Sequence, residues 1–221
     1  MKRCLCFLGI ILILISTAAG SIPAAAETAQ SGSLAQQIID YNLLRTSSET
    51  VQDWIDGYLT ENADAGTEWY AIALSNYGDY DFSLYKKALE AYLGSDVVSV
   101  PSSRLKYALA LIAAGERNSP FISDFLENSV GEQGIMSLIF GLHILNNGYT
   151  CAKYSQESLT TELLELQSAD GGWSLTGKNG DVDVTAMTVQ AIAPQYDTDS
   201  TVKKAVNQAL LFLSSKEYSF Q

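Results

Sequence analysis

The feature that most constrains this sequence is a recurring residue pair, an aromatic side chain followed by a branched aliphatic one. The pair occurs five times, at intervals of 38, 33, 37 and 50 residues. In the fourth copy, Glu162 replaces the aromatic residue. Segments rich in alanine and leucine lie between the pairs. A repeat of this length holds two helices and cannot bury its apolar face alone, so neighbouring repeats must stack. The five copies are Trp54-Ile55, Tyr92-Leu93, Phe125-Leu126, Glu162-Leu163 and Phe212-Leu213.

Apolar residues follow the helical spacing i, i+3, i+4, i+7 over most of the chain, as they do from Ile135 to Leu145. No comparable stretch alternates with period two, and none of the four prolines interrupts these stripes. The sequence therefore predicts an all-α fold of helix hairpins, about five in number. The expected helices lie near 34–45, 48–60, 66–76, 80–94, 102–115, 119–130, 134–147, 156–168, 183–193 and 199–216.

Residues that begin helices agree with these ranges. Ser119 precedes Pro120, which is a hydroxyl cap followed by a proline in the first turn, where its missing N–H costs nothing. Thr46 with Glu49 fits a capping box. Two further candidates for N-caps are Ser155 and Asp199.

One motif narrows the fold further. The segment 167–173 reads Gln-x-x-x-Gly-x-Trp, with Gln167, Gly171 and Trp173 at its fixed positions. It resembles the core of the repeat motif of squalene and oxidosqualene cyclases, related forms of which recur in protein prenyltransferase β-subunits. The order and spacing are also similar to those of bacterial secreted prenyltransferase-like proteins. The resemblance implies an α/α toroid in which inner and outer helices alternate.

The number of hairpins suggests an incomplete ring. Toroids of this kind close with about six or seven hairpins, and about five are expected here. Phe212-Leu213 is followed by Glu217 where the motif has glutamine, and the sequence stops at Gln221 before any Gly-x-Trp. We therefore expect a toroid domain over 27–221 that is truncated in its last repeat.

The motif also has a purely structural interpretation. Two adjacent glycines allow the chain to turn sharply after a helix, Gln167 can satisfy loose backbone groups, and Trp173 can fold back on the helix end. The other interpretation is that Trp173 stacks on a ligand. Tyr149 is a second candidate for ligand contact, because it is an aromatic residue in an expected helix connection.

The loop continues as Asp-Val-Asp-Val-Thr-Ala at 181–186. This resembles the cyclase acid motif Asp-x-Asp-Asp-Thr-Ala, with Val184 in place of the last aspartate. The resemblance implies that Asp183 is the catalytic acid, with Asp181 beside it. Protonating an alkene requires a carboxylic acid held in a dry cavity and tuned by neighbouring carboxyl groups, and the usual neighbour is missing. The alternative is that Asp181 or Asp183 caps the helix expected near 183.

Other chemistries of similar folds lack their residues. Prenyltransferases of this fold hold zinc with aspartate, cysteine and histidine, but Cys151 has no neighbouring Asp-x-Cys pattern and the only histidine, His143, lies in an apolar helical stripe. Val130 precedes Gly131-Glu132-Gln133 where a thioester would need cysteine. Neither a metal nor a cofactor is expected.

The N-terminus reads as a secretion signal. Lys2 and Arg3 precede an apolar run, and small residues lead to an A-x-A pattern at 24–26, so a signal peptide is expected over 1–26. Its removal leaves 11 basic and 25 acidic residues, a net charge of −14. Such a surface repels phosphate backbones and anionic membranes, so no nucleic-acid partner and no membrane insertion of the mature chain are expected.

These observations favour a secreted, non-catalytic binding or cell-surface module, whose partner is an unknown ligand or an extracellular protein. Three alternatives stay open. One is an isoprenoid cyclase or prenyltransferase that uses Asp183 as its acid. Another is a ligand-binding domain similar to cobalamin carriers, although the second small domain of those carriers is missing. The third is a fragment without a function of its own.

Overall fold

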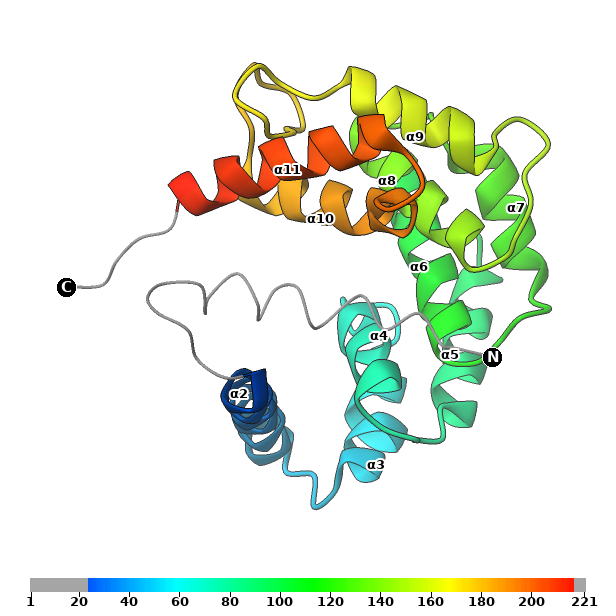
Figure 1. The fold of residues 1–221 in the computed structure, drawn as a ribbon. Coiled ribbons are helices and arrows are strands. Elements are labelled where there is room, and N and C mark those ends of the chain that lie inside the picture. Colours follow the sequence, from blue (N-terminus) through cyan, green and yellow to red (C-terminus); the bar gives the residue numbers. More distant parts are fainter. Residues whose placement is uncertain (1–23, 217–221) are drawn as a thin grey trace. The chain divides into compact units, whose positions relative to one another are not determined.

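The computed structural model describes residues 24–216, which form ten α-helices (Figure 1). No β-strand occurs in this range, and an isolated bridge joins Trp173 to Asp181. The predicted all-α class is therefore confirmed. The helices are α2 (Ala24–Thr46), α3 (Val51–Trp54), α4 (Glu68–Tyr77), α5 (Ser83–Leu93), α6 (Pro101–Ala113), α7 (Pro120–Ser129), α8 (Gly134–Asn146), α9 (Gln156–Glu165), α10 (Val182–Ile192) and α11 (Ser200–Ser215).

From α4 onward the observed helix ends differ from the expected ones by three residues or fewer. The first two differ more. The helix expected over 34–45 begins ten residues earlier, at Ala24, and the one expected over 48–60 divides into α3 and a π-helical turn η1 (Ile55–Leu59). A second short element, the 3-10 helix η2 (Ala193–Gln195), follows α10.

Two of the four expected caps are formed as predicted. The Ser155 side chain accepts a hydrogen bond from the Ser158 N–H, and Asp199 accepts from the N–H groups of Thr201 and Val202. Both side chains thereby satisfy backbone donors that a helix start leaves open.

The other two caps were predicted wrongly. The capping box lies at Thr50 and Asp53 rather than at Thr46 and Glu49. The reason is that α2 continues through Thr46, whose hydroxyl donates to the Asn42 carbonyl 2.8 Å away inside the same helix. Ser119 does precede a helix that begins at Pro120, but its buried hydroxyl has no hydrogen-bond partner among the described residues.

The described residues divide into two compact units. The first holds 24–97 and 110–119, and the second holds 98–109 and 120–216. In the first unit, α2 contacts α3, and the π-turn η1 contacts both α4 and α5. Trp54 and Tyr85 are fully buried in this unit, and Trp54 meets the Tyr70 ring edge-on at 5.2 Å between centroids.

In the second unit, α8 contacts α7, α9 and α10, and α10 also contacts α11 (Figure 1). α8 is buried at almost every position from Ile135 to Leu145, whereas α7, α9 and α11 each bury one stripe. A helix that is apolar all round must be surrounded by others, and an amphipathic helix covers a core from outside. Gly141 permits this close packing, because a Cβ there would lie 2.7 Å from Val130.

Four of the five repeat pairs lie in the helices α5, α7, α9 and α11, and Trp54-Ile55 lies where α3 passes into η1. The aliphatic member is buried in all five copies, with exposed fractions from 0% at Ile55 to 6% at Leu213. The repeat seen in the sequence therefore marks the residues that face the core.

Within residues 24–216, no helix is long and apolar enough to cross a bilayer. The expected signal peptide lies outside the described residues except for 24–26, which begin α2.

Candidate functional site

The Gln-x-x-x-Gly-x-Trp motif lies in the connection between α9 and α10. The helix ends at Glu165, and the chain then reverses because the Ser168 N–H donates to the Gly172 carbonyl at 2.8 Å. Gly171 has a φ of +89°, and a Cβ there would lie 2.8 Å from the Gln208 carbonyl oxygen of α11. Only glycine fits both the backbone angle and the space.

Trp173 has none of its surface exposed. Its indole Nε1 donates to the Leu163 carbonyl of α9 at 2.6 Å, and its backbone N–H donates to the Thr185 hydroxyl of α10 at 2.8 Å. Its carbonyl accepts from the Asp181 N–H at 2.7 Å. Trp173 therefore ties α9 to the loop through its side chain and α10 to the loop through its backbone, and its buried ring offers no face to a ligand, which does not support the stacking interpretation.

Gln167 connects the same loop to the last helix. Its amide Nε2 donates to the Gly171 carbonyl at 2.8 Å and to the Ala205 carbonyl of α11 at 2.9 Å. One side chain thus satisfies two carbonyl oxygens on different segments. Together, Gln167, Gly171 and Trp173 join α9, α10 and α11.

Asp170 is a structural part of this loop that sequence reasoning missed. Its carboxylate accepts from the Gly180 N–H at 2.9 Å and from the Gly172 N–H at 3.1 Å. The Gly180 hydrogen bond is the main reason that the pKa of this exposed carboxyl lies below its usual range, and Lys216 adds to the effect. An aspartate directly before a Gly-Gly pair was the available signal, because short acidic side chains bind nearby backbone N–H groups in turns.

Asp181 stands at the N-cap position of α10 but makes no side-chain hydrogen bond to that helix. Its carboxylate instead accepts from the Leu175 N–H of the preceding loop at 3.3 Å. The predicted side-chain cap is therefore not formed at Asp181, because the loop competes for the same oxygen atoms.

Asp183 lies in the first turn of α10, where its negative charge suits the positive end of the helix. Its side chain is exposed to solvent, whereas the neighbouring Val184 is 6% exposed. The residue at the position of the missing aspartate thus faces the core, and the candidate acid faces water.

Tyr149 lies half-buried in a different connection, between α8 and α9. The structure brings Gln167, Gly171, Trp173 and Asp181 together around one loop.

The remaining candidate groups are dispersed. No group of three or more histidine, cysteine, aspartate or glutamate side chains among the described residues could hold a metal ion. His143 is buried in α8, and burial lowers its pKa to about 4. The Cys151 thiol donates a hydrogen bond to the Glu127 carboxylate at 3.5 Å, so its partner is a carboxylate and not the histidine of a cysteine–histidine pair.

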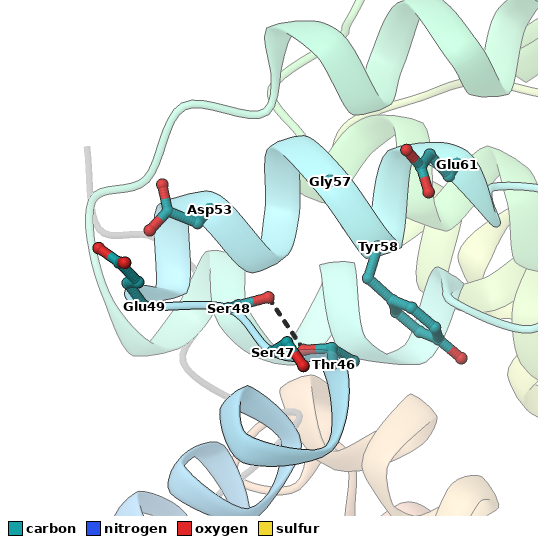
Figure 2. Close-up of a pocket in the computed structure, with 8 residues that line it drawn as sticks. All are labelled: Thr46, Ser47, Ser48, Glu49, Asp53, Gly57, Tyr58 and Glu61. Atoms are coloured by element: carbon teal, nitrogen blue, oxygen red, sulfur yellow. Dashed lines mark hydrogen bonds between the residues drawn. The ribbon is translucent and has the colours of Figure 1, made fainter.

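A groove of about 430 Å³ lies in the first unit, where α2 turns into α3 (Figure 2). Ser47 makes this turn with a φ of +56°, and the Thr46 and Ser48 hydroxyl groups are joined by a 2.9 Å hydrogen bond. The guanidinium of Arg45 lies over the Tyr58 ring, 5.2 Å from its centroid. The groove is lined by Thr46, Ser47, Ser48, Glu49, Asp53, Gly57, Tyr58 and Glu61.

The groove is therefore polar and acidic. Figure 2 shows the Glu49 and Asp53 side chains toward one end of the helix segment and Tyr58 and Glu61 toward the other. Sequence reasoning missed this surface, because its shape depends on the positive-φ turn at Ser47 and on the π-helical turn that holds Gly57 and Tyr58.

No protein-family model, curated protein or solved structure matches this chain.

Proposed function

We propose that the chain is a secreted, non-catalytic binding module built from α/α helix hairpins. The observation that carries this proposal is the exposure of Asp183 beside a buried Val184. A strong acid for alkene protonation has to be desolvated and assisted by neighbouring groups. The carboxylate at this position is instead solvated, and its expected partner is an apolar side chain.

The motif that resembles the cyclase repeat supports the same proposal. Trp173 and Gln167 use their polar atoms on the backbone of α9, the loop and α11. Groups engaged in this way stabilise the connection between helices and are not free to position a substrate.

Packing in the second unit supports the repeat architecture. α8 and α10 are separated in sequence by α9, yet they contact each other, and each also contacts an adjacent amphipathic helix. Alternating inner and outer helices produce this pattern in toroids and in open solenoids. We propose an α/α-toroid type of repeat, with α8 and α10 as inner helices.

The test is a search for turnover. The purified chain would be incubated with squalene, oxidosqualene and prenyl diphosphates, and products would be sought by mass spectrometry. The Asp183→Asn variant would serve as the matched control. We expect no product from either protein, and an Asp183-dependent product would overturn the proposal.

The secreted location has its own test. Expression of the full sequence in a bacterial host should release a protein whose N-terminus is Glu27, because the A-x-A pattern ends at residue 26. An intact N-terminus retained in the membrane fraction would contradict it.

A further inference from the structure

The two ends of the described chain carry opposite charge. Residues 27–97 hold 12 acidic and 3 basic side chains. By contrast, the segment 200–216, which is α11 and the residue after it, holds three lysines and no acidic residue, and its acidic neighbours in the sequence are Asp197, the N-cap Asp199 and Glu217. Since the whole chain is acidic, α11 is a local exception that needs a physical account.

The outward face of α11 combines lysine with leucine. Leu210 is 42% exposed and Leu211 is 74% exposed, and Lys203 and Lys204 are exposed about two turns earlier. The opposite face is buried, because Val202, Ala205, Val206, Ala209, Phe212 and Leu213 face the core. Exposed leucines beside lysines on a single helix form a surface suited to an acidic, partly apolar partner.

An acidic, partly apolar surface of this kind lies on α2 and the turn that follows it. Ile38 is 50% exposed, Tyr41 is 65% exposed and Leu44 is 82% exposed. The acidic groove begins at Thr46, two residues after Leu44, and includes the exposed side chains of Glu49 and Glu61. An apolar patch therefore adjoins negative charge here, as an apolar patch adjoins positive charge on α11.

We propose that α11 of one copy of this chain docks on α2 and the adjacent groove of a second copy. Leu210 and Leu211 lose water against Ile38, Tyr41 and Leu44, while Lys203 and Lys204 face Glu49 and Glu61. The charges select the orientation and speed the encounter, and the apolar side chains supply most of the affinity. Because the two faces differ, the contact is heterologous, and it can extend from copy to copy.

A charge-swap experiment tests the contact. The tail variant is Lys203→Glu/Lys204→Glu, and the head variant is Glu49→Lys/Glu61→Lys. Asp53 is left intact because it forms the capping box of α3. The protein would be produced from the full sequence, purified in the form that cells release, and examined by sedimentation velocity over a dilution series.

We expect the wild type to associate with rising concentration and the apparent dissociation constant of each variant to rise by about tenfold or more. An equimolar mixture of the two variants should associate again. In the mixture, the α11 made acidic in the tail variant meets the groove made basic in the head variant. The Lys153→Glu/Lys178→Glu variant has the same charge change at other exposed positions of the second unit and should associate like the wild type.

Circular dichroism of every variant would show that it is folded. A wild type that stays monomeric at all concentrations would overturn the inference. A mixture that fails to associate would also overturn it. The inference goes beyond the proposed function, because the association test and the turnover test are independent. Turnover by the chain would not argue against association, and a lack of association would not argue for turnover.

Discussion

His143 is a buried residue whose protonation at mildly acidic pH differs between the folded and the unfolded chain. Burial disfavours its charged form and lowers the folded-state pKa from 6.5 to about 4. Above pH 6.5 the residue is neutral in both states and costs nothing. Between pH 6.5 and 4 the unfolded chain binds a proton that the folded chain does not, so stability falls as pH falls.

We therefore predict that His143 lowers the free energy of unfolding by about 2–3 kcal/mol between pH 7.5 and pH 4.5. The measurement is urea unfolding of the wild type and of His143→Leu at both pH values. Carboxylates titrate equally in both proteins, so the difference between them isolates the histidine. An identical pH dependence in the two proteins would show that His143 is protonated without cost in the folded state.

Gly171 is the position where the loop tolerates no side chain. Alanine there would have to adopt a φ of +89° and place its Cβ 2.8 Å from the Gln208 carbonyl oxygen. We predict that Gly171→Ala lowers the free energy of unfolding by about 2–3 kcal/mol. Gly177→Ala in the same loop is the control, because its nearest neighbour is 3.6 Å away, and it should change stability by less than about 0.5 kcal/mol.

Among the helices, the start of α3 is where the structure moves a predicted capping box to other residues. Thr50 and Asp53 exchange two capping hydrogen bonds, at 3.1 Å to the Asp53 N–H and 2.9 Å from the Thr50 N–H. We predict that Asp53→Ala costs about 1 kcal/mol and that Glu49→Ala costs close to nothing. Chemical unfolding of both variants at neutral pH measures this difference. Equal losses of stability would contradict the assignment of the capping box to Asp53 rather than to Glu49.

The extent of most helices was predictable because their apolar stripes are visible in the sequence. The junction at 46–50 was not, because Thr46 and Thr50 are both competent caps, and only the length of α2 decides between them. The π-turn was equally hidden. The Thr60 hydroxyl donates to the Ile55 carbonyl at 2.8 Å, five residues back, and nothing in an apolar pattern signals such a bond.

The loop that carries the Gln-x-x-x-Gly-x-Trp motif was also predictable in part. Its local turn was visible in the sequence, but its contacts with distant helices were not. Spacing alone placed Gln167, Gly171 and Trp173 in one connection. The acceptors of the Gln167 amide and the Trp173 indole, Ala205 and Leu163, lie on two helices and depend on packing. The exposure of Asp183 also depends on packing, because Asp183 faces solvent when the neighbouring Val184 faces the core.

At the scale of the whole molecule, the net charge determines how thermal stability should depend on salt. The full sequence holds 13 basic and 25 acidic residues, so like charges repel more in the compact state than in the unfolded one. Salt screens this repulsion, and we predict that physiological ionic strength raises the thermal midpoint of the dilute monomer by about 2–4 °C, or about 1 kcal/mol. Lys203→Glu/Lys204→Glu makes the net charge more negative by four, because it removes two positive charges and adds two negative ones, and this variant should respond more strongly.

The same salt should weaken the proposed contact between copies, because there the facing charges are opposite. Folding stability and association therefore change in opposite directions with ionic strength, and scanning calorimetry with sedimentation on the same samples separates them. A midpoint that falls with salt would mean that attractive ion pairs outweigh the net repulsion within the folded chain. Association that strengthens with salt would mean that the leucines act alone and the lysines of α11 do not select the partner.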